Sequence, residues 1–212
     1  MMEALIHAGG RGSRMGQCGT EKPMLEIGGI PVIKRVVDAV ASSSNVSRVI
    51  VSVSDNTMET EKFLVSEGVE TIRTSGNDFV DDLHKAFEVM NDRYVMTAPC
   101  DIPLLNRQAV DMLYDFFDPD TMESAIAVVS EDMLRSIGSI PSYSIDINGR
   151  KWVLSGLCIM DRIKTLTLPN DVFIKETYML TEMFELAVNV NTQKDLEFAK
   201  KIAEYQTSNN FL

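Results

Sequence analysis

The 212-residue sequence has only three cysteines and two histidines, and it has no long apolar run. The cysteines are widely spaced and odd in number, without a Cys-x-x-Cys pair, which argues against a disulfide framework or a cysteine zinc site. Two histidines give little support to a histidine zinc site or general base. No run approaches the ~18 apolar residues of a membrane span, and no signal peptide is evident. These absences predict a cytoplasmic protein without membrane insertion.

Positive charge is also scarce. The chain has 20 Lys and Arg against 31 Asp and Glu, a formal net charge of −11. Such a charge repels nucleic acid and anionic lipid, so neither is expected as a main partner. Residues 1–35 are the exception, with five basic against three acidic side chains. A cationic segment in an acidic chain indicates a local function.

Hydrophobic residues make up 45% of the chain, which is enough for one domain with a buried core. Short β-branched or apolar runs alternate with amphipathic stretches, at 4–8, 31–42, 48–54, 59–68, 70–74, 79–90 and 94–98. This alternation predicts a single-domain, Rossmann-like α/β fold, with a mostly parallel central sheet and helices on both faces. We expect the domain to cover residues 1–206, with a loose tail at 207–212.

The alternation changes in the second half of the chain. After an expected helix at 107–117 and strand at 124–130, residues 142–154 form two alternating runs joined by Asn148-Gly149, which is typical of a β-hairpin. We expect this hairpin, together with 156–161, to be an insertion over the carboxyl ends of the strands. A final helix is expected at 195–206, after a cap at Asn191 and Thr192.

Residues 8–24 follow directly after the first expected strand. Their four closely spaced glycines, Gly9, Gly10, Gly12 and Gly16, allow tight turns that bring backbone N–H groups against a ligand. Arg11, Arg14 and Lys22 supply positive charge, and Pro23 stiffens the chain directly after Lys22. The spacing fits neither a Walker A loop nor a Rossmann fingerprint. A flexible turn with solvated charges would not explain the glycine density, so the segment predicts a site for a highly phosphorylated ligand.

The pattern Ala8-Gly9-Gly10-x-Gly12-x-Arg14-Met15-Gly16, followed by Lys22-Pro23, resembles the signature of the MobA-like nucleotidyltransferases. This family includes sugar-1-phosphate and molybdenum-cofactor nucleotidyltransferases, and the resemblance implies a nucleotide-diphospho-sugar-transferase-like fold. It also implies that Arg14 holds the triphosphate and that Lys22 offsets charge at the α-phosphate. The implied nucleotide-binding residues of the loop are Ala8, Gly9, Gly10, Arg11, Gly12 and Ser13. His7 stands where the family has Leu, Ile or Met, and we interpret it as a core histidine.

Two later residues are candidates for a magnesium site. Asp101 follows the expected strand 94–98, where a carboxylate is well placed to bind Mg²⁺ on a nucleotide's phosphates, although a helix N-cap is an alternative. The resemblance implies that Asp101 is the family's catalytic, metal-binding aspartate. Asn191, in VNVNTQKDL, resembles the family residue that closes the metal site, and a plain helix cap is equally compatible.

Residues 74–83 and 142–161 are similar to elements of the archaeal-type GTP:adenosylcobinamide-phosphate guanylyltransferases. This likeness implies nucleotide contacts from Thr74, Ser75 and Gly76, with acidic residues such as Asp82 near the purine or ribose. The implied acceptor-binding residues are Asp146, Asn148 and Gly156. The sequence departs from the family pattern at Asn77-Asp78 and at 151–155. Trp152 is expected to pack on the body of the domain rather than stack on a ligand.

The resemblance implies an Mg²⁺-dependent enzyme that transfers GMP from GTP to adenosylcobinamide phosphate and releases pyrophosphate. The acceptor phosphate is already an anionic nucleophile, so positioning and charge stabilisation suffice. Two alternatives stay open: a molybdenum-cofactor or sugar-1-phosphate nucleotidyltransferase, and a nucleotide sensor without catalysis. A homodimer is compatible with the sequence, which does not specify an assembly.

Overall fold

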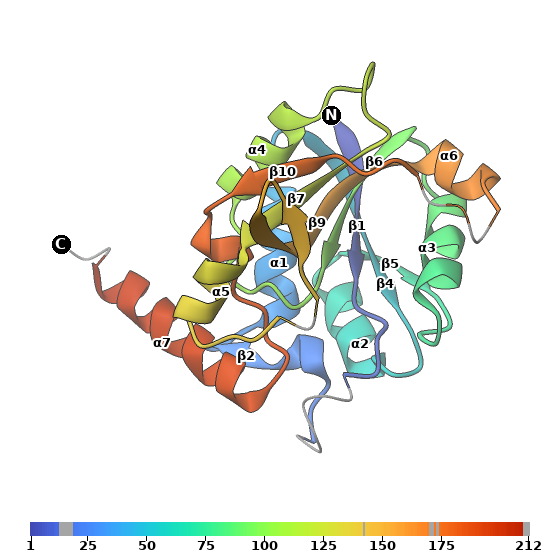
Figure 1. Ribbon diagram of the computed structural model, residues 1–212. Helices are drawn as coiled ribbons and strands as arrows, with labels where there is room; N and C mark the ends of the chain where they lie inside the picture. Colours follow the sequence, from blue (N-terminus) through green and yellow to red (C-terminus); the bar gives the residue numbers. More distant parts are fainter. Residues whose placement is uncertain (13–18, 142, 170–171, 173, 210–212) are drawn as a thin grey trace.

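The computed structural model describes residues 1–12, 19–141, 143–169, 172 and 174–209. Its centre is an eight-stranded sheet in the order β10-β7-β9-β6-β1-β4-β5, with β8 paired to β9 (Figure 1). The strands are β1 (Met2–His7), β4 (Val46–Val53), β5 (Glu70–Arg73), β6 (Tyr94–Pro99), β7 (Ser124–Ser130), β8 (Ile145–Ile147), β9 (Arg150–Asp161) and β10 (Tyr178–Thr181). A separate small sheet pairs β2 (Glu26–Ile27) with β3 (Ile30–Pro31).

Most neighbouring strands of the large sheet are parallel. Strands β5, β4, β1 and β6 run in one direction, and β10 runs parallel to β7. Only β9, with its hairpin partner β8, runs antiparallel to its neighbours. The mostly parallel central sheet that the sequence predicts is therefore confirmed.

Helices cover both faces of this sheet, as predicted. Successive residues of a strand point to opposite faces. Ile6 of β1 belongs to the hydrophobic cluster that includes α1 (Val32–Ala41), α2 (Met58–Ser66), α4 (Arg107–Phe116) and α5 (Glu131–Ser136). Leu5 belongs to a second cluster, with α3 (Phe79–Glu88) and α6 (Arg162–Thr167). In Figure 1, α1, α4 and α5 lie on one side of β1, and α3 and α6 lie on the other.

The predicted hairpin is present, but its second strand is longer than expected. Asn148 and Gly149 both have positive φ, 55° and 79°, which suits the tight turn between β8 and β9. Residues 156–161, expected to belong to the insertion, instead continue β9 between β6 and β7. This part of β9 includes the buried residues Leu157 and Ile159, so burial in the sheet explains the difference.

The C-terminal helix α7 (Gln193–Asn209) is also longer than expected. It packs Leu196 and Ala199 against Ile27 of β2 and Val188. No glycine or proline ends it near residue 206, so three residues of the expected loose tail continue the helix. Residues 210–212 lie outside the described part. No helix among the described residues is long and apolar enough to cross a bilayer.

Candidate active site

The site lies where β1, β4 and β6 end. His7, the last residue of β1, is in register with Ser52 of β4 and Pro99 of β6. The glycine segment after β1 and Asp101 after β6 therefore meet at one edge of the sheet, as expected for ligand sites in parallel α/β folds. A cavity of about 450 Å³ opens there. Its lining includes three residues of the glycine segment, Gly9, Gly10 and Gly12, together with Lys22, Asp101 and Asn191.

Lys22 joins the two residues predicted to hold a metal. Its Nζ donates to Asp101 Oδ2 over 2.6 Å and to Asn191 Oδ1 over 2.9 Å. The side chains of Lys22 and Asp101 are only 15% and 16% exposed. The structure thus brings together three residues from widely separated segments. Asp101 Oδ1 is also buried, and it has no hydrogen-bond partner among the described residues.

Asn191 faces the site rather than capping α7. The cap is made by Thr192 and Asp195: Thr192 Oγ1 accepts from Asp195 N over 3.3 Å, and Asp195 Oδ2 accepts from Thr192 N over 2.8 Å. The side-chain oxygen of Asn191 is therefore available to Lys22. The backbone N–H of Val190 donates to Asp101 O over 2.8 Å and fixes this segment against the end of β6.

Glu21 fixes the position of Lys22, and sequence reasoning missed it. Its carboxylate accepts hydrogen bonds from Glu59 N (2.8 Å), Thr60 N (2.7 Å) and Thr60 Oγ1 (2.6 Å), at the start of α2. The N-cap residue of α2, Thr57, makes no side-chain cap of its own. Glu21 therefore replaces the cap and ties α2 to the short 3-10 helix η2 (Lys22–Met24).

The glycine segment is tied to the loop after β4. Gly9 O accepts from Ser54 Oγ over 2.7 Å and from Asn56 Nδ2 over 3.2 Å. Gly76 packs on the same carbonyl: its φ is 66°, and an added Cβ would lie 2.5 Å from Gly9 O. Glycine is thus required at position 76. Among the other implied nucleotide contacts, Ala8, Gly10 and Gly12 line the cavity, whereas Ser13 and Arg14 lie outside the described residues.

Asp82 stabilises the turn at residues 74–76. Its carboxylate accepts from Ser75 N and Ser75 Oγ, both over 2.8 Å, and from Gly76 N over 2.9 Å. Both of its oxygens accept hydrogen bonds within the protein, and the residue also lines the cavity, so the contact to the purine or ribose that the sequence suggested stays a prediction. Thr74 is buried, and its N–H donates to Val53 O over 2.8 Å. Arg11 reaches the same region, where its Nη2 donates to Asn77 Oδ1 over 2.5 Å.

A second cavity of about 750 Å³ adjoins the first and shares Pro99, Asp101 and Asn191 with it. Gly156 lines this cavity at φ 88°, where an added Cβ would lie 2.7 Å from Pro99 Cγ. Asp146 and Asn148, the other implied acceptor contacts, line neither cavity. Asp146 Oδ1 instead accepts from Gly149 N over 3.0 Å and stabilises the hairpin turn.

Two further residues have structural roles. Burial raises the pKa of the Cys100 thiol to about 12, so it is protonated near neutral pH and is a poor nucleophile. Trp152 is 6% exposed, with the Arg150 guanidinium 4.8 Å from its ring centroid, and packs on the body of the protein as expected.

A model of the MobA-like NTP transferase domain matches residues 4–156. The chain belongs to this family. Among curated proteins, it is 28% identical over 212 residues to the adenosylcobinamide-phosphate guanylyltransferase of Methanocaldococcus jannaschii, covering 95% of this chain and 97% of that protein. It is 30% identical over 159 residues to the molybdenum cofactor guanylyltransferase of Cupriavidus metallidurans, covering 74% of this chain and 67% of that protein.

Solved structures of other proteins share the fold. The structure of CMP:2-keto-3-deoxy-manno-octonic acid synthetase with CTP superposes with a TM-score of 0.74 at 16% identity, covering 96% of this chain and 98% of that one. HddC from Yersinia pseudotuberculosis with GMP-PN superposes with a TM-score of 0.71 at 17% identity, covering 96% of this chain and 100% of that one. These likenesses establish the fold, and the family model establishes nucleotidyl transfer as the family's chemistry.

Proposed function

We propose that this protein transfers GMP from GTP to adenosylcobinamide phosphate and releases pyrophosphate. The observation that carries the proposal is the cluster of Lys22, Asp101 and Asn191 at the junction of two cavities. The glycine-lined cavity suits the nucleotide, because its backbone and Lys22 can meet the phosphates. The larger cavity suits a bulky acceptor. The relative from Methanocaldococcus jannaschii, similar over nearly the whole chain, supports this pair of substrates.

In the proposed reaction, an oxygen of the acceptor phosphate attacks the α-phosphorus of GTP. The bond from that phosphorus to the β-phosphate oxygen breaks, and pyrophosphate leaves with the electron pair. Lys22 offsets the negative charge that gathers around the α-phosphate. No proton has to be removed from the nucleophile, so the structure needs no general base. Pro99, Asp101 and Asn191, which line both cavities, lie where the two substrates meet.

The residues present suit Mg²⁺. Asp101 and Asn191 already direct oxygens at one cation, the ammonium of Lys22, and Asp101 Oδ1 is buried without a partner among the described residues. Hard oxygen donors of this kind are the ligands that Mg²⁺ takes, usually alongside water and substrate phosphates. No cluster of three or more His, Cys, Asp or Glu residues occurs in the described part, so substrate oxygens would complete the set. When bound, the ion would neutralise phosphate charge.

A calorimetric comparison of GTP, ATP, CTP and UTP tests the nucleotide half of the proposal without any acceptor. We expect GTP to bind most tightly in the presence of Mg²⁺. A preference for CTP or UTP would contradict guanylyl transfer and favour the sugar-1-phosphate or cytidylyl branch of the family.

A molybdenum cofactor is the second candidate acceptor, favoured by the relative from Cupriavidus metallidurans. An enzyme that uses this acceptor would bind GTP in the same cavity and would differ only in the larger cavity. Nucleotide binding therefore cannot distinguish the two candidates, whereas competition between the acceptors can. A homodimer and a cytoplasmic location stay predictions from the sequence.

A further inference from the structure

His7 is a polar residue at the end of a buried, mostly apolar strand. Side-chain alternation along β1 puts it on the same face as Leu5, which is fully buried against α3. There the imidazole contacts the ring of Phe79, with 5.0 Å between the ring centroids. An aliphatic side chain could fill this space without bringing a polar atom into it. The histidine therefore needs an explanation beyond packing.

The imidazole has a nitrogen without a partner. Nε2 of His7 is buried, and it makes no hydrogen bond to any residue that the structure describes. A buried polar atom in this state destabilises a protein, and such atoms often have a function. The position of His7 indicates what that function is, because the residue lines the proposed nucleotide cavity.

The protonation state and the surroundings of His7 limit what it can bind. Burial lowers its pKa to about 4, against the opposing effect of Asp82, so the ring is neutral near neutral pH. A neutral imidazole has one donor and one acceptor. The charged groups on this part of the cavity wall are the carboxylates Asp78 and Asp82, which repel phosphate. The phosphates are expected beside Lys22, and an uncharged part of the nucleotide beside His7.

We propose that the neutral imidazole of His7 hydrogen-bonds the base of the bound nucleotide and contributes to the choice of guanine. This proposal rests on the proposed function, which places GTP in the cavity. Guanine has the acceptor O6 where adenine has the N6 amino donor, so one imidazole nitrogen that bonds this position of guanine would be mismatched with adenine. The exposed ring of Phe79 offers the base an apolar surface beside this contact. A buried hydrogen-bonding group discriminates because a mismatched base would leave it unpaired.

The substitution His7→Met tests this contact, because methionine adapts to the available space without hydrogen bonding. Calorimetry without acceptor is expected to show that His7→Met weakens GTP binding about three- to tenfold, the usual effect of losing one hydrogen bond, and leaves ATP binding unchanged. His7→Gln, which keeps a donor and an acceptor, is expected to lose less affinity. The melting temperature of nucleotide-free His7→Met is expected to equal or exceed that of the wild type. Wild-type affinity for GTP in His7→Met would overturn the proposal.

A measurement on the unaltered protein keeps the proposal testable if the variants do not fold. The chain has only two histidines, and His84 lies outside the nucleotide cavity. With ¹⁵N-labelled histidine, GTP is expected to shift the imidazole resonances of His7 and leave those of His84 in place. If neither histidine responds, the proposed contact does not exist. Lack of preference for GTP in the wild type would instead contradict the proposed function, and the two failures are thus distinguishable.

Discussion

At the scale of single residues, the site depends on the position of the Lys22 ammonium. Asp101 and Asn191 hold it from two sides, and all three side chains come from different segments of the chain. A positive charge placed beside the α-phosphate stabilises the negative charge that develops there during transfer. Lys22 should therefore act mainly on the rate of transfer.

Lys22→Ala is expected to lower kcat by about 10²- to 10³-fold, the usual loss when one preorganised electrostatic partner is removed. The matched control is Lys34→Ala, which removes the same charge from the same cationic segment. Lys34 pairs with Asp38 on the outer side of α1, so its loss should leave kcat unchanged. Steady-state pyrophosphate release measures kcat in the two variants, and circular dichroism verifies that they fold. Near wild-type turnover in Lys22→Ala would contradict the assigned role.

Some roles of single residues can be predicted from the sequence, and others cannot. Lys22, Asp101 and Asn191 stand in motifs with recognisable neighbours, and the structure brings them together. Asp82 and Asp146 were expected near substrates, and both accept hydrogen bonds from nearby turns; Asp82 also lines the nucleotide cavity, whereas Asp146 lines neither cavity. An aspartate beside a turn can bind a ligand or the backbone, and residue type alone does not distinguish the two. The turn conformation decides, and that requires coordinates.

At the scale of elements, α2 is connected to the site through Glu21. The carboxylate satisfies two backbone N–H groups at the start of α2 and lies next to Lys22 in the chain. The contact joins residues about forty positions apart, so no local pattern in the sequence predicts it. The helix thereby helps to fix the position of Lys22.

Glu21→Ala is expected to lower the free energy of unfolding by about 1–2 kcal/mol, as when a helix cap is removed. It should also lower kcat, because Lys22 loses its anchor, whereas Glu21→Gln keeps one acceptor oxygen and should recover part of both losses. Lys62→Ala, an exposed change on the same helix, is the control. Urea denaturation and pyrophosphate release measure the two effects. Normal kcat in a destabilised Glu21→Ala would show that Glu21 only stabilises α2.

The β8–β9 hairpin shows which parts of an element a sequence can predict. Its turn depends on two adjacent residues, Asn148 and Gly149, and was found from them. The course of β9 depends on the partners β6 and β7, which lie far away in the chain. Non-local pairing of this kind has no signature within the strand itself. The same holds for the end of α7, where only the absence of a terminating residue is visible in the sequence.

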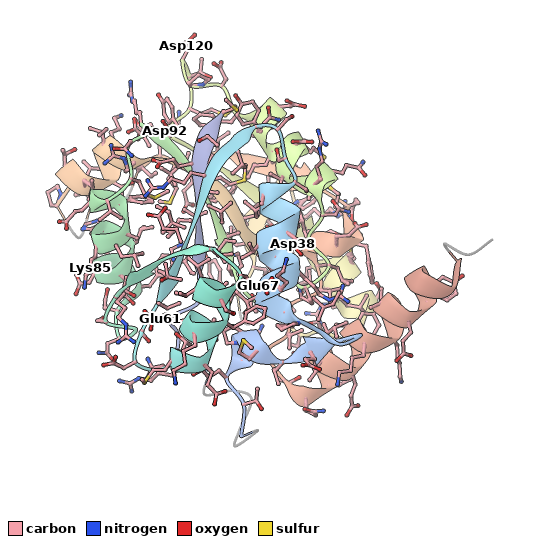
Figure 2. The ribbon with its side chains drawn as sticks, turned by 180° about the vertical axis from the view of Figure 1, so that it is seen from behind. Asp38, Glu61, Glu67, Lys85, Asp92 and Asp120 are labelled. Atoms are coloured by element: carbon pink, nitrogen blue, oxygen red, sulfur yellow. The ribbon has the colours of Figure 1, made fainter. Side chains whose placement is uncertain are left out.

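At the scale of the whole molecule, much of the acidic excess behind the net charge of −11 lies on the outer surface. Carboxylates such as Asp38 and Glu67 are exposed on the outer side of α1 and at the end of α2 (Figure 2). Lys22 and Asp101 lie in the cavity at the end of the sheet. Most of the acidic excess is thus solvated surface and takes no part in the site.

Glu3 should make the stability of the whole molecule sensitive to acid. Burial alone would raise its pKa, but hydrogen bonds from the backbone of Asp92 and Asn91 and from Arg48 together lower it below 4.5. A carboxylate with a lowered folded-state pKa stabilises the fold above its unfolded pKa, and this stability is lost as the pH falls through the folded value. Denaturation at a series of pH values should show that the free energy of unfolding falls less in acid for Glu3→Gln than for the wild type. The exposed Asp120→Asn should behave like the wild type, and an equal acid response in Glu3→Gln would exclude this role.

A transfer assay with defined acceptors distinguishes guanylyl transfer to adenosylcobinamide phosphate from its alternatives. The protein is incubated with GTP and Mg²⁺ and with one of three acceptors: adenosylcobinamide phosphate, molybdopterin or glucose 1-phosphate. Pyrophosphate is measured together with the mass of the product. We expect pyrophosphate and a GDP-linked cobinamide with the first acceptor alone, and a loss of both in Lys22→Ala. Release with one of the other acceptors but none with adenosylcobinamide phosphate would contradict the proposed function.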